Sequence, residues 1–488
     1  MSSIIHILPD EISQDDIDDL KKRYDRVREY IWQKDYKNLI SLSQVLETFI
    51  RFIETGKSLC IYGRVIKVDD FGKLIFAELQ DEFRSIELKL SFNINPLPFD
   101  IWKQYVKLGD WIVVSGQASY SRDGDPQIEV HDLSFLSLCG LLPNYSGISE
   151  HALSSKRASR FVHTQMISNP KEVAASKARS TALLAIREFL ADENFDEQIT
   201  PILTNSFHGG GSHPFTTYSR YENRDLYLRL TAEIAIKMLI AGGLSRVYEI
   251  GPSFRNETTD SLHMLGFTLL EAYAVCVTFD EMIELLERMI IRVFSDVKNV
   301  WGGDELPHLN LEFQKFDRIP AKYAISKFVG VDFTLAEGIA KLAKLVGAEF
   351  PKNDEETTKL IYRAVEKLVY PSITRPTFLT ELPAGISPLI QENPQDSTTL
   401  QRAFLVWNGI QFGEVFSSKL DAVSITEDIM KQTVDWKSMS GIVNRDYRNF
   451  LHAMFCGIPP TSVMDVGIER LFMLLLGKKD IRTLLIDI

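Results

Sequence analysis

The hydrophobic and polar positions of the chain change their period along its length. Residues 10–54 follow a helical period, in which DDIDDLKKRYDRVREYIWQ has acids early and bases late, as the helix dipole favours, and Ser13 precedes it as a cap. Its basic residues alternate with acids and are expected on a solvated face. SLSQVLETFIRFIET is a second amphipathic segment. Residues 58–138 hold five short alternating runs separated by turn residues, which predicts a small β-barrel, with an OB-fold as first choice.

Beyond the barrel, helical and strand-like segments alternate. KEVAASKARSTALLAIREFLADENF predicts a long helix, and DEQITPIL predicts a strand entered near a proline. The stretch 317–370 is largely helical and is interpreted as an insertion that packs on a central sheet. We therefore expect an α+β protein with a helical extension at 1–55, the barrel at 56–140, a linker at 141–175 and a larger domain at 176–488.

Composition narrows the class of protein without naming a function. The chain has 488 residues, of which 45% are hydrophobic and 25% charged, as in ordinary soluble proteins. The net charge of −12 argues against non-specific nucleic-acid binding by the whole surface, but permits a local basic patch. There is no long apolar run, no signal peptide and no paired cysteine spacing, so we expect a cytoplasmic protein with no membrane contact, zinc site or disulfide framework.

The stretch RVYEIGPSFRNETTDSLHMLGFTLLEAY reads as two strands joined by a polar loop. Strand alternation would put Arg255 beside Glu257 in the first strand, and Phe267, Glu271 and Tyr273 on one face of the second. Alternating polar residues are usually only the solvated face of a strand. A guanidinium, an aromatic plane and a Glu–Tyr pair also suit a ligand with a phosphate, a flat ring and a cation. ATP together with a basic amino acid fits this description.

Four segments in order carry a resemblance to a known family. FRNE, a loop with His263 and FT-x-x-E-x-Y resemble motif 2 of class II aminoacyl-tRNA synthetases, in the form found in lysyl-tRNA synthetases. The helix at 176–191 with its following strand resembles motif 1, and 376–389 is similar to a lysyl-tRNA synthetase stretch. GIPPTSVMDVGIERLFMLLL resembles motif 3, with Arg470 three positions after Gly467 on one helical face. With the barrel, the resemblance to a bacterial-type lysyl-tRNA synthetase covers nearly the whole chain.

The resemblance implies a fold, a reaction and partners. The fold is an antiparallel sheet flanked by helices, behind an N-terminal OB-fold that binds the anticodon of tRNA. The reaction is ATP-dependent activation of lysine or an amine-bearing analogue to an aminoacyl-adenylate, followed by transfer to tRNA. Both reactants are anionic, so catalysis rests on positioning and charge neutralisation and needs no general base. A homodimer is implied by motif 1.

The resemblance also assigns roles to individual residues. Arg255 would bridge the amino-acid carboxylate and the α-phosphate, and Glu257 would meet the adenine edge. Phe267 would stack on the adenine ring with Arg470 on its other side, and His263 would steady the pyrophosphate. Of these, Arg255, Arg470 and His263 are the implied catalytic residues. The implied substrate contacts are Gly209, Glu233, Glu271, Tyr273, Glu414, Phe416 and Ser418.

The chain departs from the family pattern at the site. Phe404 and Gln411 stand where the family has two metal-binding glutamates, which leaves Mg²⁺ binding uncertain because Mg²⁺ prefers anionic oxygen ligands. Glu414 replaces a carboxylate-binding asparagine, and Ser418 replaces the glutamate that meets the lysine ammonium. Asp465 lies in a segment that replaces a glycine-rich turn. These changes predict an amine-bearing ligand placed differently from lysine, with the ammonium anchor moved from position 418 to 414.

The barrel departs from the pattern as well. Phe76 and Glu87 fall where the family uses a phenylalanine and a glutamine to read the central anticodon base. Phe76 can still stack on a base. Glu87 accepts but cannot donate a hydrogen bond, which would cost about 1–3 kcal/mol against a carbonyl-bearing base. Anticodon reading of the usual lysine type is therefore in question.

Three functions remain open from the sequence. The first is an aminoacyl-tRNA ligase for lysine or a close analogue, which the two-domain organisation favours. The second is a paralogue that activates an amino acid for a non-tRNA acceptor, such as a protein or small molecule. The third is a catalytically silent binding or regulatory homologue, which the changes at Phe404 and Gln411 favour.

Overall fold

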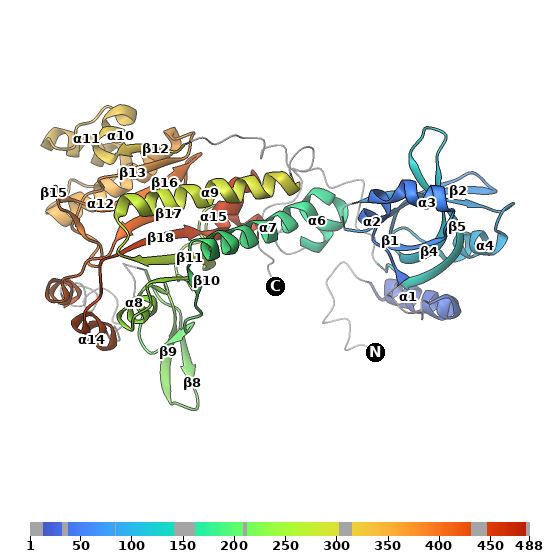
Figure 1. Ribbon diagram of the computed structural model, residues 1–488, viewed down its shortest axis with the longest axis horizontal. Helices are drawn as coiled ribbons and strands as arrows, with labels where there is room; N and C mark the ends of the chain where they lie inside the picture. The colour runs from blue at the N-terminus through green and yellow to red at the C-terminus, as the bar shows by residue number, and fades with distance from the viewer. Residues whose placement is uncertain are drawn as a thin grey trace. The chain divides into compact units, whose positions relative to one another are not determined.

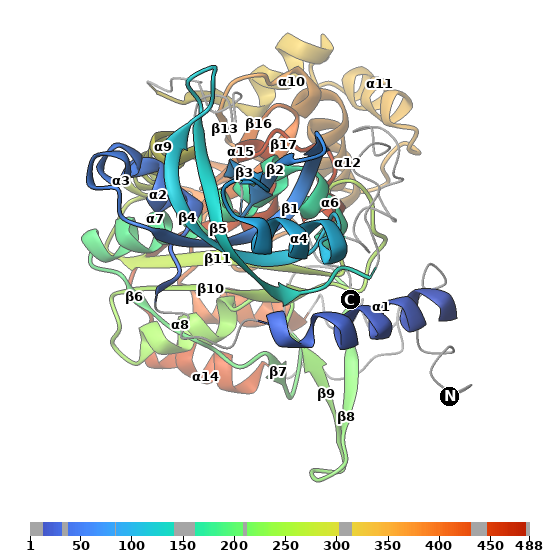
Figure 2. The same cartoon turned by 90° about the vertical axis from the view of Figure 1, so that its right-hand side faces the viewer.

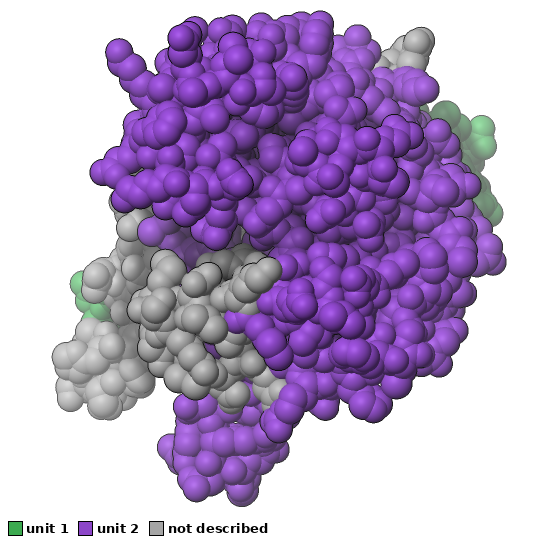
Figure 3. All heavy atoms as spheres, turned by 90° about the vertical axis from the view of Figure 1, so that its left-hand side faces the viewer, with its two compact units in different colours: residues 1–176 green, residues 177–488 purple. Residues whose placement is uncertain are grey.

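The chain folds into two units, residues 1–176 and 177–488, each built around its own β-sheet and coloured separately in Figure 3. The computed structural model describes residues 13–31, 38–82, 84–140, 162–207, 212–301, 315–430 and 447–484. No helix within these ranges is long and apolar enough to cross a membrane.

The first unit contains a closed five-stranded barrel with strand order β1-β2-β3-β5-β4, which confirms the predicted OB-fold. Its strands are β1 (Leu59–Asp70), β2 (Leu74–Gln80), β3 (Ser85–Ser91), β4 (Trp111–Tyr120) and β5 (Pro126–Ser137). Alternate side chains fill the barrel, as the two-residue period predicts. The sequence interpretation missed helix α4 (Pro96–Tyr105), which begins at a proline and buries Phe99 and Trp102.

Three short helices precede the barrel: α1 (Gln14–Val27), α2 (Leu42–Glu47) and α3 (Phe49–Thr55). The predicted cap is present, because the Ser13 hydroxyl accepts from the Asp16 amide and the Asp16 carboxylate accepts from the Ser13 amide. The second amphipathic segment is divided at Thr48, where the backbone leaves the helical region, so it forms two helices.

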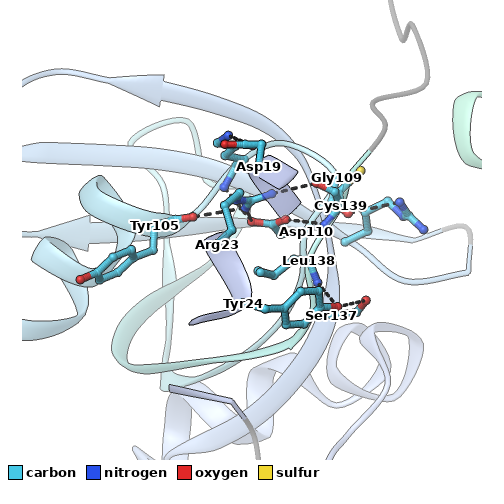
Figure 4. A network of polar contacts seen from close by, with 11 residues as sticks. Asp19, Arg23, Tyr24, Tyr105, Gly109, Asp110, Ser137, Leu138 and Cys139 are labelled. Carbon is cyan, nitrogen blue, oxygen red and sulfur yellow. Dashed lines mark hydrogen bonds and ion pairs between the residues drawn. The ribbon is translucent and has the colours of Figure 1, made fainter. Parts of the chain in front are cut away.

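A buried ion pair attaches α1 to the barrel (Figure 4). Arg23 donates to the Asp110 carboxylate at 2.7 Å and to the Cys139 carbonyl at 2.8 Å. The Asp110 carboxylate also accepts from the amides of Lys107 and Cys139. Burial raises the pKa of Asp110 despite these donors, so the guanidinium is needed to offset the cost of its charge. The expectation that this helix presents its basic residues to solvent is wrong for Arg23, which is 6% exposed.

Replacing Arg23 with Met should destabilise the first unit by about 3 kcal/mol, because it leaves the Asp110 carboxylate buried without its counter-charge. Scanning calorimetry of the full chain should show a lower melting temperature for the transition that involves this unit. Lys22→Met is the matched control, since Lys22 is the exposed neighbour on the same helix. Equal melting temperatures for the two variants would contradict this role of the ion pair.

The second unit is built on an eight-stranded sheet of order β12-β13-β16-β17-β18-β11-β10-β6 (Figures 1 and 2). Only the β6–β10 and β12–β13 pairs are parallel. The prediction of an antiparallel sheet flanked by helices is confirmed. The strands are β6 (Asp196–Glu197), β10 (Arg246–Phe254), β11 (Gly266–Val275), β12 (Asp317–Pro320), β13 (Thr377–Thr380), β16 (Arg402–Trp407), β17 (Ile410–Ser417) and β18 (Thr461–Gly467).

Helices pack on both faces of this sheet. Helix α9 (Phe279–Trp301) packs on β17 and β18, where Leu286 lies behind Gly413 (Figure 1). Residues next to Gly413 in the strand therefore point to the other face. On that face, Ile236 of α8 (Glu233–Ala241) packs in one apolar cluster with side chains of β11, β17 and β18. Other α-helices among the described residues are α7 (Pro170–Asp192), α10 (Ala321–Val329), α11 (Ala336–Val346), α12 (Asp354–Ala364), α14 (Arg448–Cys456) and α15 (Ile468–Leu475), whereas α6 (Val162–Ser168) lies in the first unit.

The segment 317–370 is largely helical, but it begins with β12, which forms an edge of the main sheet. Two small sheets complete the unit. One contains β7 (Leu203–Thr204), β8 (Thr216–Ser219) and β9 (Arg224–Leu228), and the other contains β14 (Glu392–Asn393) and β15 (Asp396–Leu400).

Candidate functional site

The hairpin β10–β11 positions the first candidate residues. Its strands pair from Arg246 opposite Ala274 to Phe254 opposite Gly266. Because β10 ends at Phe254, Arg255 and Glu257 lie in the connecting loop, and the prediction that they lie side by side on a strand is wrong. The strand pairing does not continue past Arg255, because the backbone amide of Asn256 donates to the carbonyl of His213 rather than to the partner strand. Glu257 is exposed.

Arg255 lies over an aromatic ring at the end of the hairpin. Its guanidinium carbon is 5.1 Å from the centroid of the Phe267 ring. Its Nε is buried and has no hydrogen-bond partner. Since an unsatisfied buried donor costs free energy, this atom is suited to receive an acceptor from a ligand. The arginine and the ring together fit an anionic group that carries a planar base.

Arg470 reaches the same loop from a distant part of the chain. It lies on α15, which begins at Ile468, so the prediction that Gly467 and Arg470 share one helical face is wrong, because Gly467 ends β18 in an extended conformation. Its Nε donates to the Leu262 carbonyl at 3.2 Å, and its Nη1 donates to the Gln411 carbonyl at 2.9 Å. Burial and the positive charge of Arg255 lower the pKa of Arg470. Two guanidiniums that repel one another in a partly buried site favour an anion bound between them.

His263 lies in the loop between β10 and β11. Its Nδ1 is 2.9 Å from the Asp260 carboxylate, and the imidazole is 42% exposed. The pairing holds the ring within the loop, and the exposure leaves its other edge accessible to a ligand.

Three carboxylates form a row across three neighbouring strands. Asp465 on β18 lies directly opposite Glu271 on β11 and directly opposite Glu414 on β17. Residues opposite one another share a face, with Cβ atoms about 5 Å apart. Sequence reasoning included Glu271 and Glu414 in the site but not Asp465. The alternation of Val463, Asp465 and Gly467 on β18 was the available signal.

The members of this row are compensated unequally. Arg402 donates to Glu414 at 2.7 and 3.0 Å. Glu271 accepts from the Ala232 amide at 2.7 Å and from the hydroxyls of Thr231 and Tyr273. Burial nevertheless raises the pKa of Glu271 to about 7. The Oδ1 of Asp465 is buried with no hydrogen-bond partner, and burial with the neighbouring carboxylates raises its pKa well above the usual range.

Glu233 begins helix α8 beside this row. It forms an ion pair with Lys237 one turn later, at 2.7 Å. Its negative charge contributes to the raised pKa of Glu271. The carboxylate that the resemblance assigns to the amino group of the substrate therefore already has a cationic partner in this structure.

The next row along the same face is apolar. Val463 on β18 lies directly opposite Tyr273 on β11 and directly opposite Phe416 on β17. All three side chains are almost completely buried. Ser418 is 4% exposed, and its Oγ has no hydrogen-bond partner. Gly209, which the resemblance assigned to the substrate, lies outside the described residues.

The two positions that replace metal-binding glutamates have structural partners. Phe404 is 6% exposed and packs in the core beside Tyr362, with their ring centroids 5.9 Å apart. The side-chain oxygen of Gln411 accepts from the Tyr370 hydroxyl at 3.2 Å. Within the part of the chain that the structure describes, no group of three or more His, Cys, Asp or Glu side chains is placed to hold a metal ion. Phe404 and Gln411 therefore do not fit the family metal site.

The predicted base-reading residues lie on the outside of the barrel. Phe76 on β2 is beside the exposed ring of Phe71, with the centroids 6.1 Å apart. Glu87 on β3 accepts a short hydrogen bond from the side-chain amide of Gln127, which lies opposite it on β5 and is 3% exposed. The partner of Glu87 could not be predicted from sequence, because β3 and β5 pair only through the closure of the barrel.

The mainly antiparallel sheet, with the motif 2 segment on β10 and β11 and the motif 3 segment on β18 and α15, is the catalytic architecture of the class II aminoacyl-tRNA synthetases. A family model described as tRNA synthetases class II (D, K and N) matches residues 155–486, and one described as an OB-fold nucleic acid binding domain matches residues 59–136. The chain belongs to this class II tRNA synthetase family.

Curated relatives cover most of the chain. A lysine–tRNA ligase of Dehalococcoides mccartyi is 30% identical over 444 residues, which are 87% of this chain and 86% of the relative. A lysine–tRNA ligase of Thermoanaerobacter pseudethanolicus is 30% identical over 441 residues, with 88% and 86% covered. One of Prochlorococcus marinus is 29% identical over 471 residues, with 92% and 91% covered.

The raised pKa of Glu271 predicts a pH dependence of stability. A folded-state pKa of about 7, above the ordinary value of 4.5, stabilises the ligand-free fold fully below pH 4.5. This contribution decreases as the pH rises towards 7 and is lost above it. Glu271→Gln should therefore reduce the loss of melting temperature between pH 5 and pH 8, relative to the unsubstituted protein. The exposed Glu257→Gln should leave that loss unchanged, and identical pH profiles for all three proteins would contradict the assignment.

Proposed function

We propose that the chain activates a basic amino acid with ATP and transfers it to tRNA. In the first step the amino-acid carboxylate attacks the α-phosphorus, a new O–P bond forms, and pyrophosphate leaves with the electrons of the broken P–O bond. In the second step a tRNA hydroxyl attacks the activated carbonyl and AMP leaves. The observation that carries this proposal is the pair Arg255 and Arg470, which meet at the loop beside the Phe267 ring.

The site chemistry supports specific roles for these residues. Arg255 neutralises the α-phosphate through its unpaired buried Nε while Phe267 stacks on the base. Arg470 adds a second positive charge, and His263 meets the pyrophosphate end. Glu257 meets the adenine edge. Each contact stabilises negative charge or fixes geometry, which is what this reaction requires.

Two observations support tRNA as the acceptor over a protein or a small molecule. The chain matches an OB-fold nucleic acid binding domain at residues 59–136, before the catalytic unit in the sequence, and relatives that align over most of the chain are named lysine–tRNA ligases. Phe76 offers a ring for base stacking. The Glu87 carboxylate accepts a hydrogen bond from Gln127, and an ionised carboxylate has only acceptor atoms to offer a base. This favours a base edge with an amino group over a carbonyl edge.

The proposal places no catalytic step on a metal held by Phe404 or Gln411. Magnesium that accompanies ATP would be held through the phosphates, because Phe404 has no ligand atom and Gln411 is neutral. The two arginines therefore supply the charge neutralisation that this chain itself provides.

We also propose that the chain forms a homodimer through the motif 1 region. Large apolar side chains are exposed around α7, β6 and β7: Leu184 is 56% exposed, Ile199 93%, Ile202 40% and Leu203 48%. Such a patch next to a free sheet edge supports a protein–protein contact.

Activation can be tested by ATP–pyrophosphate exchange with lysine and other amino acids, and transfer by charging of total tRNA. Arg255→Ala and Arg470→Ala should each reduce exchange by about 10²–10³-fold, because each removes a donor to developing negative charge. Arg292→Ala is the matched control, since Arg292 lies on the surface of α9 in an ion pair with Asp296. Absence of exchange with every amino acid would overturn the proposed activity in favour of a silent homologue. Exchange without charging would overturn tRNA as the acceptor.

The homodimer can be tested by light scattering coupled to size exclusion. Leu184→Glu combined with Ile199→Glu should convert a dimer to a monomer, because two charges would be buried in the contact. Leu345→Glu is the matched control, since Leu345 is 49% exposed on α11, away from motif 1. A monomeric unsubstituted protein, or a dimer that survives both substitutions, would contradict the proposed interface.

A further inference from the structure

We propose that Asp465, together with Glu271, binds the ammonium group of a basic amino acid, and that this aspartate is the cation anchor particular to this chain. The inference rests on the proposed function and deepens it, because it assigns the part of the site that selects the substrate. It replaces Glu414 as the expected anchor.

Two of the four carboxylates at this end of the site already have a cationic partner. Glu414 is already paired with Arg402, and Glu233 is already paired with Lys237. Glu271 is held by neutral donors only. Asp465 has a buried oxygen without any partner. Of Glu233 and the three carboxylates of the row, Asp465 and Glu271 are therefore the two without an ion-pair partner.

The second support is the position of Asp465 in the sheet. It is the middle member of the row, so an ammonium in front of it is within reach of Glu271 on one side and Glu414 on the other. Burial weakens the screening of charge, which strengthens a charge-assisted hydrogen bond at this place. A primary ammonium has three donors, enough to satisfy Asp465 and Glu271 together.

A third, independent observation lies on the same strand face. Ser418 follows Glu414 and Phe416 in alternation, and its buried Oγ also has no partner. A hydroxyl is neutral and cannot offset an ammonium, so this position alone does not anchor the charge. It offers an additional polar contact to an amine-bearing ligand, whereas Phe416 and Tyr273 supply the apolar wall for its methylene groups.

The polarity of the site fixes the orientation of such a ligand. Phe267 and Glu271 lie on one face of β11, four residues apart, which is about 13 Å along a strand. The arginines are at the Phe267 end, and the carboxylates are at the other. A basic amino acid therefore places its carboxylate towards Arg255 and its side-chain ammonium towards Asp465.

The test is binding of lysine, ornithine and norleucine to the full chain without ATP, by calorimetry and thermal shift. Lysine or ornithine should bind, and norleucine, which lacks the side-chain ammonium, should bind at least about tenfold more weakly. Asp465→Asn should weaken amine binding by at least about tenfold, since it keeps the shape and removes the charge. Glu392→Gln, an exposed carboxylate change in the same unit, is the matched control and should have no effect.

The melting temperature of the ligand-free variant separates a binding role from a structural one. If Asp465 binds the ligand, Asp465→Asn should leave the ligand-free melting temperature unchanged or raise it, because it removes one carboxyl group from a row of neighbouring carboxylates. A lower melting temperature with unchanged amine affinity would overturn the inference. Equal binding of norleucine and the amines would also overturn it. These measurements omit ATP. Intact amine binding without ATP–pyrophosphate exchange would therefore contradict only the proposed catalysis.

Discussion

The compensation of buried charge on the central sheet is the constraint on which the site depends. Glu249, Glu271, Asp465 and Glu414 follow one another across four adjacent strands, because each lies opposite the next. Burying carboxylates in such a row is costly unless each has a partner. At the two ends the protein supplies arginines, since Arg229 pairs with Glu249 and Arg402 with Glu414. In the middle, Glu271 has only neutral donors and the Oδ1 of Asp465 has no hydrogen-bond partner. A cationic ligand therefore stabilises these two carboxylates more than the two at the ends.

Features set by local sequence were predicted well. The alternation that predicted the barrel is confirmed because the inside of each strand is filled by every second residue. The Ser13 cap is also local, since it depends on residues within one helical turn. Where the chain leaves a regular element, the prediction failed. Arg255 was predicted to lie on a strand, but that strand ends one residue earlier, at Phe254. The hydrogen bond from the Asn256 amide to the His213 carbonyl could not be predicted from the sequence of the hairpin alone.

Features set by pairing between distant segments could not be predicted. Asp465 lies beside Glu271 and Glu414 only because β18 is inserted between β11 and β17, and a register change of one residue would turn it to the other face. The same holds for Arg23, whose burial depends on Asp110, 87 residues further along the chain. The family resemblance supplied the roles of residues shared with relatives. It could not supply the consequence of a residue that departs from the family pattern.

The departures acquire a common physical meaning when the charges are taken together. Gln411, whose backbone carbonyl accepts from Arg470, stands where a carboxylate is expected, so negative charge is removed near that arginine, while Asp465 adds negative charge to the row that runs through Phe404, Glu414 and Glu271. The electrostatic difference between the two ends therefore rests on side chains of the protein itself. A basic amino acid entering in the reverse direction would place its carboxylate against Glu271 and Asp465 and its side-chain ammonium against Arg255. Like charges at both ends would oppose that orientation, so the sheet selects the direction of the substrate before any phosphate is bound.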